Sequence, residues 1–193
     1  MLIVHAGNRI DARRRAVARF PADQVESVRA RVRLLLTALQ PERVLSNAAA
    51  GADLIVLAEA QQLGIPVDVV LPIDADEFVR QSVADNGDEW VTTFHHVLAR
   101  AEAEPHSVVR HGNQSGDDDW YESANEHLLA QALHAAARTT PPTHVVALTI
   151  RPLPTPGEES ITDHFADLAA RAGLLVLTLD PATPDHPVVV STQ

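Results

Sequence analysis

The chain has 193 residues, a formal net charge of −11 and no cysteine. This length suits one domain with a full hydrophobic core, and the lack of cysteine excludes disulfides, thiolate metal sites and cysteine nucleophiles. Every basic residue besides histidine is an arginine, which excludes a lysine Schiff base and a P-loop lysine. The acidic balance disfavours nucleic-acid binding, because phosphate neutralisation needs a basic surface.

Short β-branched runs alternate with longer segments rich in Ala, Leu and Arg. In chain order, the pattern predicts a strand at 1–5, a helix at 21–40, a strand at 42–48, a helix at 51–64, a strand at 65–72, helices at 74–83 and 88–104, a strand at 106–112, a helix at 120–140, a strand at 143–150, a helix at 161–173 and a strand at 174–180. Pro21 is expected at the first helical position.

This alternation predicts an α/β fold, a doubly wound, mostly parallel Rossmann-like sheet with helices on both faces. We expect a single domain over 1–180, followed by a proline-rich tail at 181–193 that runs over the surface. No apolar run is long enough to cross a bilayer, and residues 1–5 are too short for a signal peptide. A cytoplasmic protein without a membrane partner is therefore expected.

Ligands of such sheets bind beyond the carboxyl ends of the strands, which directs attention to the loops at 6–20, 46–52, 72–76, 110–119 and 149–158. In the first loop, Gly7 permits close approach of a backbone, while Asn8 and Arg9 are placed to contact a ligand. A guanidinium binds two oxygens of a phosphate or carboxylate at once. The alternative for the neighbouring arginines at 13–15 is a solvated run that pairs with surface acids.

In the second loop, the small residues Ala49, Ala50, Gly51 and Ala52 precede a helix that starts near Asp53. Free N–H groups at a helix N-terminus favour anions, so this segment is a candidate phosphate site, with Asp53 capping the loop or facing a ribose. The alternative is close helix–strand packing that requires small side chains.

The loop at 151–160 contains Thr155-Pro156-Gly157-Glu158, which has the form of a helix capping box. Its functional interpretation places Pro156 and Gly157 beside a phosphate, with Glu158 or Glu159 near a ribose. Capping is the favoured interpretation from local chemistry.

Asp119 and Glu122 have the spacing of another capping box. The ten histidines show no HExxH or comparable metal spacing, so no metal site and no cofactor are expected.

Several segments resemble the SLOG superfamily, Rossmann-like domains related to the cytokinin-activating LOG phosphoribohydrolases and to the DNA-processing protein of natural transformation. His5 to Arg9 stand where members carry a turn after the first strand, and Ser46 to Ala60, with GADLIVLAEA, resembles the family's S-G-x-A-x-G-A-D segment. Tyr121 and Asn125 resemble a Y-x-x-x-N helix start. Asn47 and Ala50 stand where the family often has Gly and Glu, and the LOG P-G-G-x-G-T-x-x-E signature is reduced to PGEES.

The resemblance implies a nucleotide or nucleotide-derived ligand, bound by Gly7 to Arg9, by 49–53, by Tyr121 and Asn125, and by Pro156 and Gly157. It further implies a sensor role in a bacterial defence or signalling system, and we expect a homo-oligomer. The first alternative is a nucleotide N-glycosidase or phosphoribohydrolase, for which Glu158, Glu159, Asp53 and Glu122 are the available carboxylates. The second is a protein-interaction module with a decayed pocket.

Overall fold

A computed structural model describes residues 1–11, 16–110, 120–153, 160–183 and 187–191. A seven-stranded sheet with the order β4-β3-β2-β1-β5-β6-β7 lies at its centre. Its strands are β1 (Leu2–Gly7), β2 (Arg43–Ser46), β3 (Val67–Leu71), β4 (Val108–Arg110), β5 (Val145–Ile150), β6 (Leu175–Leu179) and β7 (Val189–Ser191). The first six are parallel, and β7 pairs antiparallel with β6. The α/β prediction of a mostly parallel, Rossmann-like sheet is confirmed.

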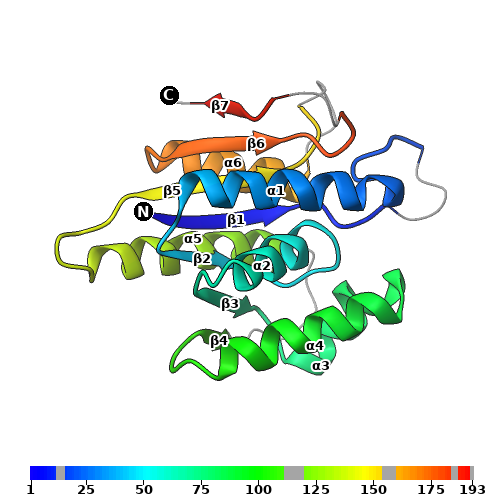
Figure 1. The fold of residues 1–193 in the computed structure, drawn as a ribbon, viewed down its shortest axis with the longest axis horizontal. Helices are drawn as coiled ribbons and strands as arrows, with labels where there is room; N and C mark the ends of the chain where they lie inside the picture. The colour runs from blue at the N-terminus through cyan, green and yellow to red at the C-terminus, as the bar shows by residue number, and fades with distance from the viewer. Residues whose placement is uncertain (12–15, 111–119, 154–159, 184–186, 192–193) are drawn as a thin grey trace.

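Helices cover both faces of the sheet (Figure 1). One face carries α1 (Val25–Leu39), α2 (Ala52–Gln62), α3 (Ala75–Ser82) and α4 (Asp88–Glu102), and the other carries α5 (Trp120–Ala137) and α6 (Ile161–Arg171). Two short 3-10 turns, η1 (Ala22–Gln24) and η2 (Ala84–Asn86), adjoin α1 and α3. None of the helices in the described ranges is both long and apolar enough to span a membrane.

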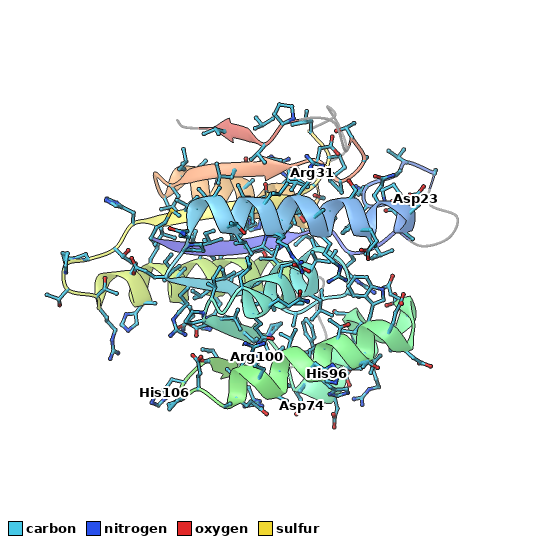
Figure 2. All side chains as sticks on the ribbon, viewed as in Figure 1. Asp23, Arg31, Asp74, His96, Arg100 and His106 are labelled. Atoms are coloured by element: carbon cyan, nitrogen blue, oxygen red, sulfur yellow. The ribbon has the colours of Figure 1, made fainter. Side chains whose placement is uncertain are left out.

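Two apolar layers follow from the alternation of side chains along the buried strands. In β1, Ile3 belongs to the core beneath α1, α2 and α4, whereas Leu2 and Val4 belong to the core beneath α5 and α6. Both layers are built largely from Ala, Val, Leu and Ile, in keeping with the low aromatic content. The central strands are therefore covered on both faces, and a ligand can reach them only at the ends of the sheet. Figure 2 shows how the polar side chains, such as Asp23, Arg31 and His96, surround this core.

Two details differ from the sequence prediction. Pro21 is the N-cap residue of η1 rather than the first residue of a helix, and α1 begins only at Val25. The tail was expected to run over the surface, but Val189–Ser191 forms β7 against β6. The three residues of β7 are too few for a clear periodic pattern and stand among prolines, which explains why the sequence did not reveal the strand.

A buried carboxylate joins α1 to α2. Glu59 of α2 is fully buried, and its two oxygens accept hydrogen bonds from Arg29 Nη1 at 3.1 Å and from Arg33 Nε at 2.6 Å. Both arginines come from α1 and keep part of their surface in solvent. The arrangement satisfies the buried charge without burying the two cations completely.

We expect Glu59→Ala to lower the free energy of unfolding by about 2–4 kcal/mol, measured by urea denaturation. The change removes two charge-assisted hydrogen bonds and leaves a cavity between the helices. Glu26 is the matched control because it also pairs with Arg29, at 3.5 Å, but is 85% exposed. Glu26→Ala should cost less than about 1 kcal/mol. Equal losses in the two variants would show that burial does not determine the contribution of Glu59.

Candidate functional site

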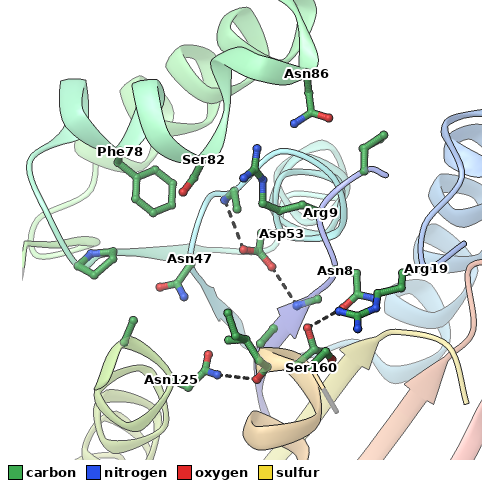
Figure 3. A pocket seen from close by; sticks show the side chains of 18 of the residues that line it. Asn8, Arg9, Arg19, Asn47, Asp53, Phe78, Ser82, Asn86, Asn125 and Ser160 are labelled. Carbon is green, nitrogen blue, oxygen red and sulfur yellow. Dashed lines mark hydrogen bonds between the residues drawn. The ribbon is translucent and has the colours of Figure 1, made fainter. Parts of the chain in front are cut away.

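A pocket of about 370 Å³ lies beyond the carboxyl ends of β1, β2 and β3, beside the point where the strand order reverses between β1 and β5 (Figure 3). This is the place where open α/β sheets bind ligands. Its walls come from the segments after β1 and β2, from α3 and η2, and from the first turns of α5 and α6. The lining residues are Ala6, Gly7, Asn8, Arg9, Ile10, Arg19, Asn47, Ala49, Asp53, Pro72, Phe78, Ser82, Asp85, Asn86, Ala124, Asn125, Ser160, Ile161 and Thr162.

The carboxylate of Asp53 joins the segments that form the base of this pocket. Its Oδ1 accepts the N–H of Gly7 at 3.1 Å, and its Oδ2 accepts the N–H of Ala49 at 3.3 Å. The Nε2 atom of His5, a fully buried side chain, lies 3.4 Å from the same Oδ1. The His5 ring is held by its other nitrogen, Nδ1, which donates to the carbonyl of Leu148 at 2.9 Å. Of the two roles considered for Asp53, the contacts support anchoring the loop.

Asn8 connects the end of β1 to the start of α6. Its backbone N–H donates to the carbonyl of Ile150 at 2.9 Å, and its Oδ1 accepts the hydroxyl of Thr162 at 2.8 Å. Its Nδ2 atom is buried and has no hydrogen-bond partner within the described residues. Asn125 of α5 supports the same helix start, because its Nδ2 donates to the carbonyl of Ile161 at 2.9 Å. Asn8 therefore keeps one donor unused at the pocket wall.

Arg9 lines the pocket but already has protein partners. One guanidinium nitrogen forms an ion pair with Asp85, and Nη1 donates to the carbonyl of Gln81 at 3.3 Å. The remaining donor, Nε, is buried and has no partner in the part of the chain that the structure describes. Arg9 therefore joins the β1 loop to α3 and η2, in addition to presenting positive charge to the pocket.

Arg19 is a pocket residue that the sequence analysis did not single out. The carboxylate of Asp11 accepts the backbone N–H groups of Arg19 at 2.8 Å and Phe20 at 2.9 Å, and this brings the end of the loop back to the pocket. Within the described ranges, the guanidinium of Arg19 has no hydrogen-bond or ion-pair partner. The sequence analysis did not connect Arg19 with the pocket, because Arg19 lies far along the loop from Gly7. The available signal was Asp11, since an aspartate side chain favours a local turn.

Of the four residues Ala49 to Ala52, predicted to offer backbone N–H groups to a phosphate, three have N–H groups that already donate within the protein. The N–H of Ala49 donates to Asp53, that of Ala50 donates to the carbonyl of Ser82 at 2.9 Å, and that of Ala52 donates to the carbonyl of Asn8 at 3.2 Å. Ala49 still lines the pocket, whereas Ala50, Gly51 and Ala52 do not.

Close packing explains the glycines on either side of this contact. A Cβ atom at Gly51 would lie 2.8 Å from the nitrogen of Ile10 and 2.9 Å from the carbonyl oxygen of Asn8, and its φ is +114°. A Cβ at Gly7 would lie 2.3 Å from the Cβ of Ala52. The alternative interpretation, small residues for close packing, therefore accounts for this segment.

Some candidates cannot be placed. Pro156, Gly157, Glu158 and Glu159, together with both predicted capping boxes, fall outside the described residues, as does the side chain of Tyr121. The capping box that begins α6 consists instead of Ser160 and Asp163. In the described ranges, no three histidines, aspartates or glutamates are arranged to hold a metal ion.

The sequence analysis also missed Asn47, Phe78 and Ser82 as pocket residues. Asn47 directly follows β2, within one of the loops that the fold rule selects, so its position was the available signal. Phe78 and Ser82 are one helical turn apart on α3, a spacing that places both on the same face. Nothing in the sequence indicates that this face turns toward the pocket.

Fold and pocket together define an α/β protein of Rossmann-like architecture with a ligand-sized cavity at the reversal of strand order. Comparison with known families finds no family model that matches the chain, and comparison with curated proteins finds no match. The resemblance to the SLOG superfamily stays a prediction.

We expect Gly51→Ala to lower the free energy of unfolding by about 1–3 kcal/mol more than Gly87→Ala, because only the first introduces an overpacked contact. Gly87 is the matched control. It also precedes a helix and has a similar φ of +109°, but a Cβ there would meet nothing within 4 Å. Thermal or urea unfolding of the two variants provides the comparison. Equal destabilisation would mean that backbone strain, rather than contact with Asn8 and Ile10, requires glycine at 51.

Proposed function

We propose that the pocket binds a nucleotide or a nucleotide-derived ligand and that the protein acts as a sensor of it. The carrying observation is Arg19, a cation that has no counter-ion among the described residues and lines the pocket where an α/β sheet normally binds its ligand. A phosphate is the group that such a guanidinium binds best, since the planar fork matches two of its oxygens.

The start of α6 lines the same pocket as Arg19 and supports the same assignment. The first N–H groups of a helix have no acceptor within the helix and carry partial positive charge. The hydroxyl of Ser160 takes the N–H of Asp163 at 3.2 Å, while Ile161 and Thr162 line the pocket. Asn8 belongs to the same group, because its Oδ1 accepts the hydroxyl of Thr162 while the Nδ2 of the same amide has no partner in the described residues. Three kinds of hydrogen-bond donor therefore line this pocket, namely a guanidinium, a side-chain amide and the N–H groups of a helix start.

The first alternative, nucleotide hydrolysis, needs a carboxylate that is free to protonate a leaving group or activate water. Two carboxylates among the described residues line the pocket, and both are engaged. Asp53 accepts two backbone N–H groups, and Asp85 pairs with Arg9. Glu158 and Glu159 remain the candidates for that chemistry. The second alternative, an interaction module with a decayed pocket, is less well supported because the cavity is formed and its lining includes polar groups without a partner in the described part of the chain.

The direct experiment is mass spectrometry of the native protein, followed by denaturation to release any ligand purified with it. A nucleotide recovered at a constant molar ratio would support the proposal. The same native spectra would test the expected homo-oligomer, and the bacterial defence or signalling context remains an implication of the SLOG resemblance.

We expect Arg19→Ala to weaken binding of ribose 5-phosphate or a nucleoside monophosphate by about 10- to 100-fold, the loss typical of a charged hydrogen bond. Isothermal titration calorimetry measures the effect. Arg171→Ala is the control, because Arg171 is exposed at the far end of α6 and does not line the pocket. Unchanged affinity in Arg19→Ala would remove Arg19 from the site.

Arg9→Ala should differ from Arg19→Ala by lowering both affinity and stability. Arg9 joins the β1 loop to Asp85 and Gln81, so its removal loosens the contact with α3 and η2 as well as removing charge. The expected loss of affinity is again about 1–3 kcal/mol. Titration and thermal unfolding of one preparation separate the two effects. A binding defect without any change in melting temperature would contradict the connecting role.

We expect no release of free base from AMP, CMP, GMP, IMP or UMP above background during long incubation, measured by chromatography. The reason is the absence of a free carboxylate among the described pocket residues and the reduced PGEES segment. Glu158→Ala and Glu159→Ala serve as controls. Turnover in the wild type that disappears in either variant would replace the sensor proposal with the phosphoribohydrolase alternative.

A further inference from the structure

The pocket has a second end that the phosphate contacts do not use. Figure 3 shows Phe78, Ser82 and Asn47 on one side of the cavity and Arg19, Asn8 and Ser160 on the other. Pro72, at the end of β3, also lines the pocket. One side of the cavity therefore carries Arg19 and the donors of Asn8, while the other combines an apolar wall with Asn47 and Ser82 and adjoins the ion pair of Arg9 and Asp85.

Two polar side chains at this second end have no partner among the residues that the structure describes. The hydroxyl of Ser82 is fully buried and has no hydrogen-bond partner in the described ranges, although the carbonyl of the same residue accepts the N–H of Ala50. Asn47 is half-buried, and neither end of its amide forms a hydrogen bond within the described part of the chain. Buried polar groups are almost always paired, so two unpaired groups in one cavity wall indicate a missing partner.

The apolar side of this end is rigid. Phe78 is almost completely buried and stacks on Phe94 of α4, with ring centroids 6.1 Å apart and an interplanar angle of 23°. Ser82 follows Phe78 by one turn of α3, so one helix presents both the apolar wall and the hydroxyl. An amide and a hydroxyl beside such a wall suit a flat ring that offers neighbouring donor and acceptor atoms.

We infer that Asn47 and Ser82 determine which ring the pocket accepts, by hydrogen bonding to the edge of a planar heteroaromatic group that lies against Phe78 and Pro72. This inference rests on the proposed function, in which that group is the base of a nucleotide. The phosphate then lies at Arg19 and the start of α6. An asparagine amide offers one donor and one acceptor, which matches the paired edge of a base.

The apo protein should show a specific signature of this role. Removing a buried hydroxyl that has no partner does not cost a hydrogen bond, so Ser82→Ala should melt at the same temperature as the wild type or higher. If the hydroxyl of Ser82 were needed for folding, its removal would lower the melting temperature. Loss of binding without loss of stability is the expected outcome for a group reserved for a ligand.

The test titrates wild type, Asn47→Ala and Ser82→Ala with ribose 5-phosphate and with AMP, CMP, GMP, IMP and UMP. The wild type should bind at least one nucleotide tenfold or more tightly than ribose 5-phosphate, with a clear order among the bases. Each variant should lose about five- to tenfold for the preferred nucleotide and bind ribose 5-phosphate within twofold of the wild type. Ser27→Ala is the control, because Ser27 lies on α1 and does not line the pocket.

The outcomes separate this inference from the proposed function. If the wild type binds ribose 5-phosphate and all five nucleotides equally, the phosphate site stands and the role of Asn47 and Ser82 is overturned. Preserved base preference in Asn47→Ala and Ser82→Ala overturns it as well. If the wild type binds neither ribose 5-phosphate nor any nucleotide, the proposed function itself fails. A lower melting temperature for Ser82→Ala would assign the hydroxyl to the fold.

Discussion

The carboxylate of Asp53 is the contact on which the geometry of the pocket depends. It is almost completely buried and holds the N–H groups of Gly7 and Ala49, so it fixes the end of β1 to the loop that follows β2. A carboxylate that accepts backbone N–H groups at the start of a helix gains from the local dipole as well as from the bonds. Because Asn8 and Arg9 come directly after Gly7, their directions follow from this bond. Asp53 also occupies the start of α2, where an external anion would otherwise bind.

Because the molecule is strongly acidic, local contacts determine whether an anion binds to it. With a net charge of −11, the protein as a whole repels anions at distances where salt does not screen the field. Under the proposed function, a phosphate would therefore be held by short-range donors rather than attracted by the surface. The pocket provides them through the Arg19 guanidinium and the start of α6, while Arg9 is largely neutralised by Asp85. An anion that bound Nη2 of Arg9 would compete with Asp85 for that nitrogen.

The elements of the fold were predictable because their signals are local. Alternating apolar strands and amphipathic helices, such as the face of Val28, Val32 and Leu36 on α1, require no knowledge of distant residues. The position of the pocket was also predictable, since Gly7 to Arg9, Ala49 and Asp53 follow strand ends. What failed was the assignment of partners. The N–H groups of Ala50 and Ala52 are satisfied by Ser82 and Asn8, which are distant in sequence.

The sequence also does not reveal which polar groups lack a partner, and this applies to Arg19, Asn47 and Ser82. Their importance lies in having no partner within the described residues, and a sequence contains no record of which polar groups remain unpaired. Arg19 looked like any other arginine of a basic loop until the Asp11 turn placed it beside the pocket. Local patterns identify secondary structure, whereas a binding site depends on contacts between segments far apart in the chain.

The antiparallel β7 has a consequence for how the protein meets other chains. It covers the edge of β6, a five-residue strand that would otherwise expose a row of backbone donors and acceptors. The sheet then ends in three-residue strands on both sides, β4 and β7. A neighbouring molecule that extended the sheet would gain only a few hydrogen bonds at either edge. Edge-to-edge aggregation is thereby discouraged.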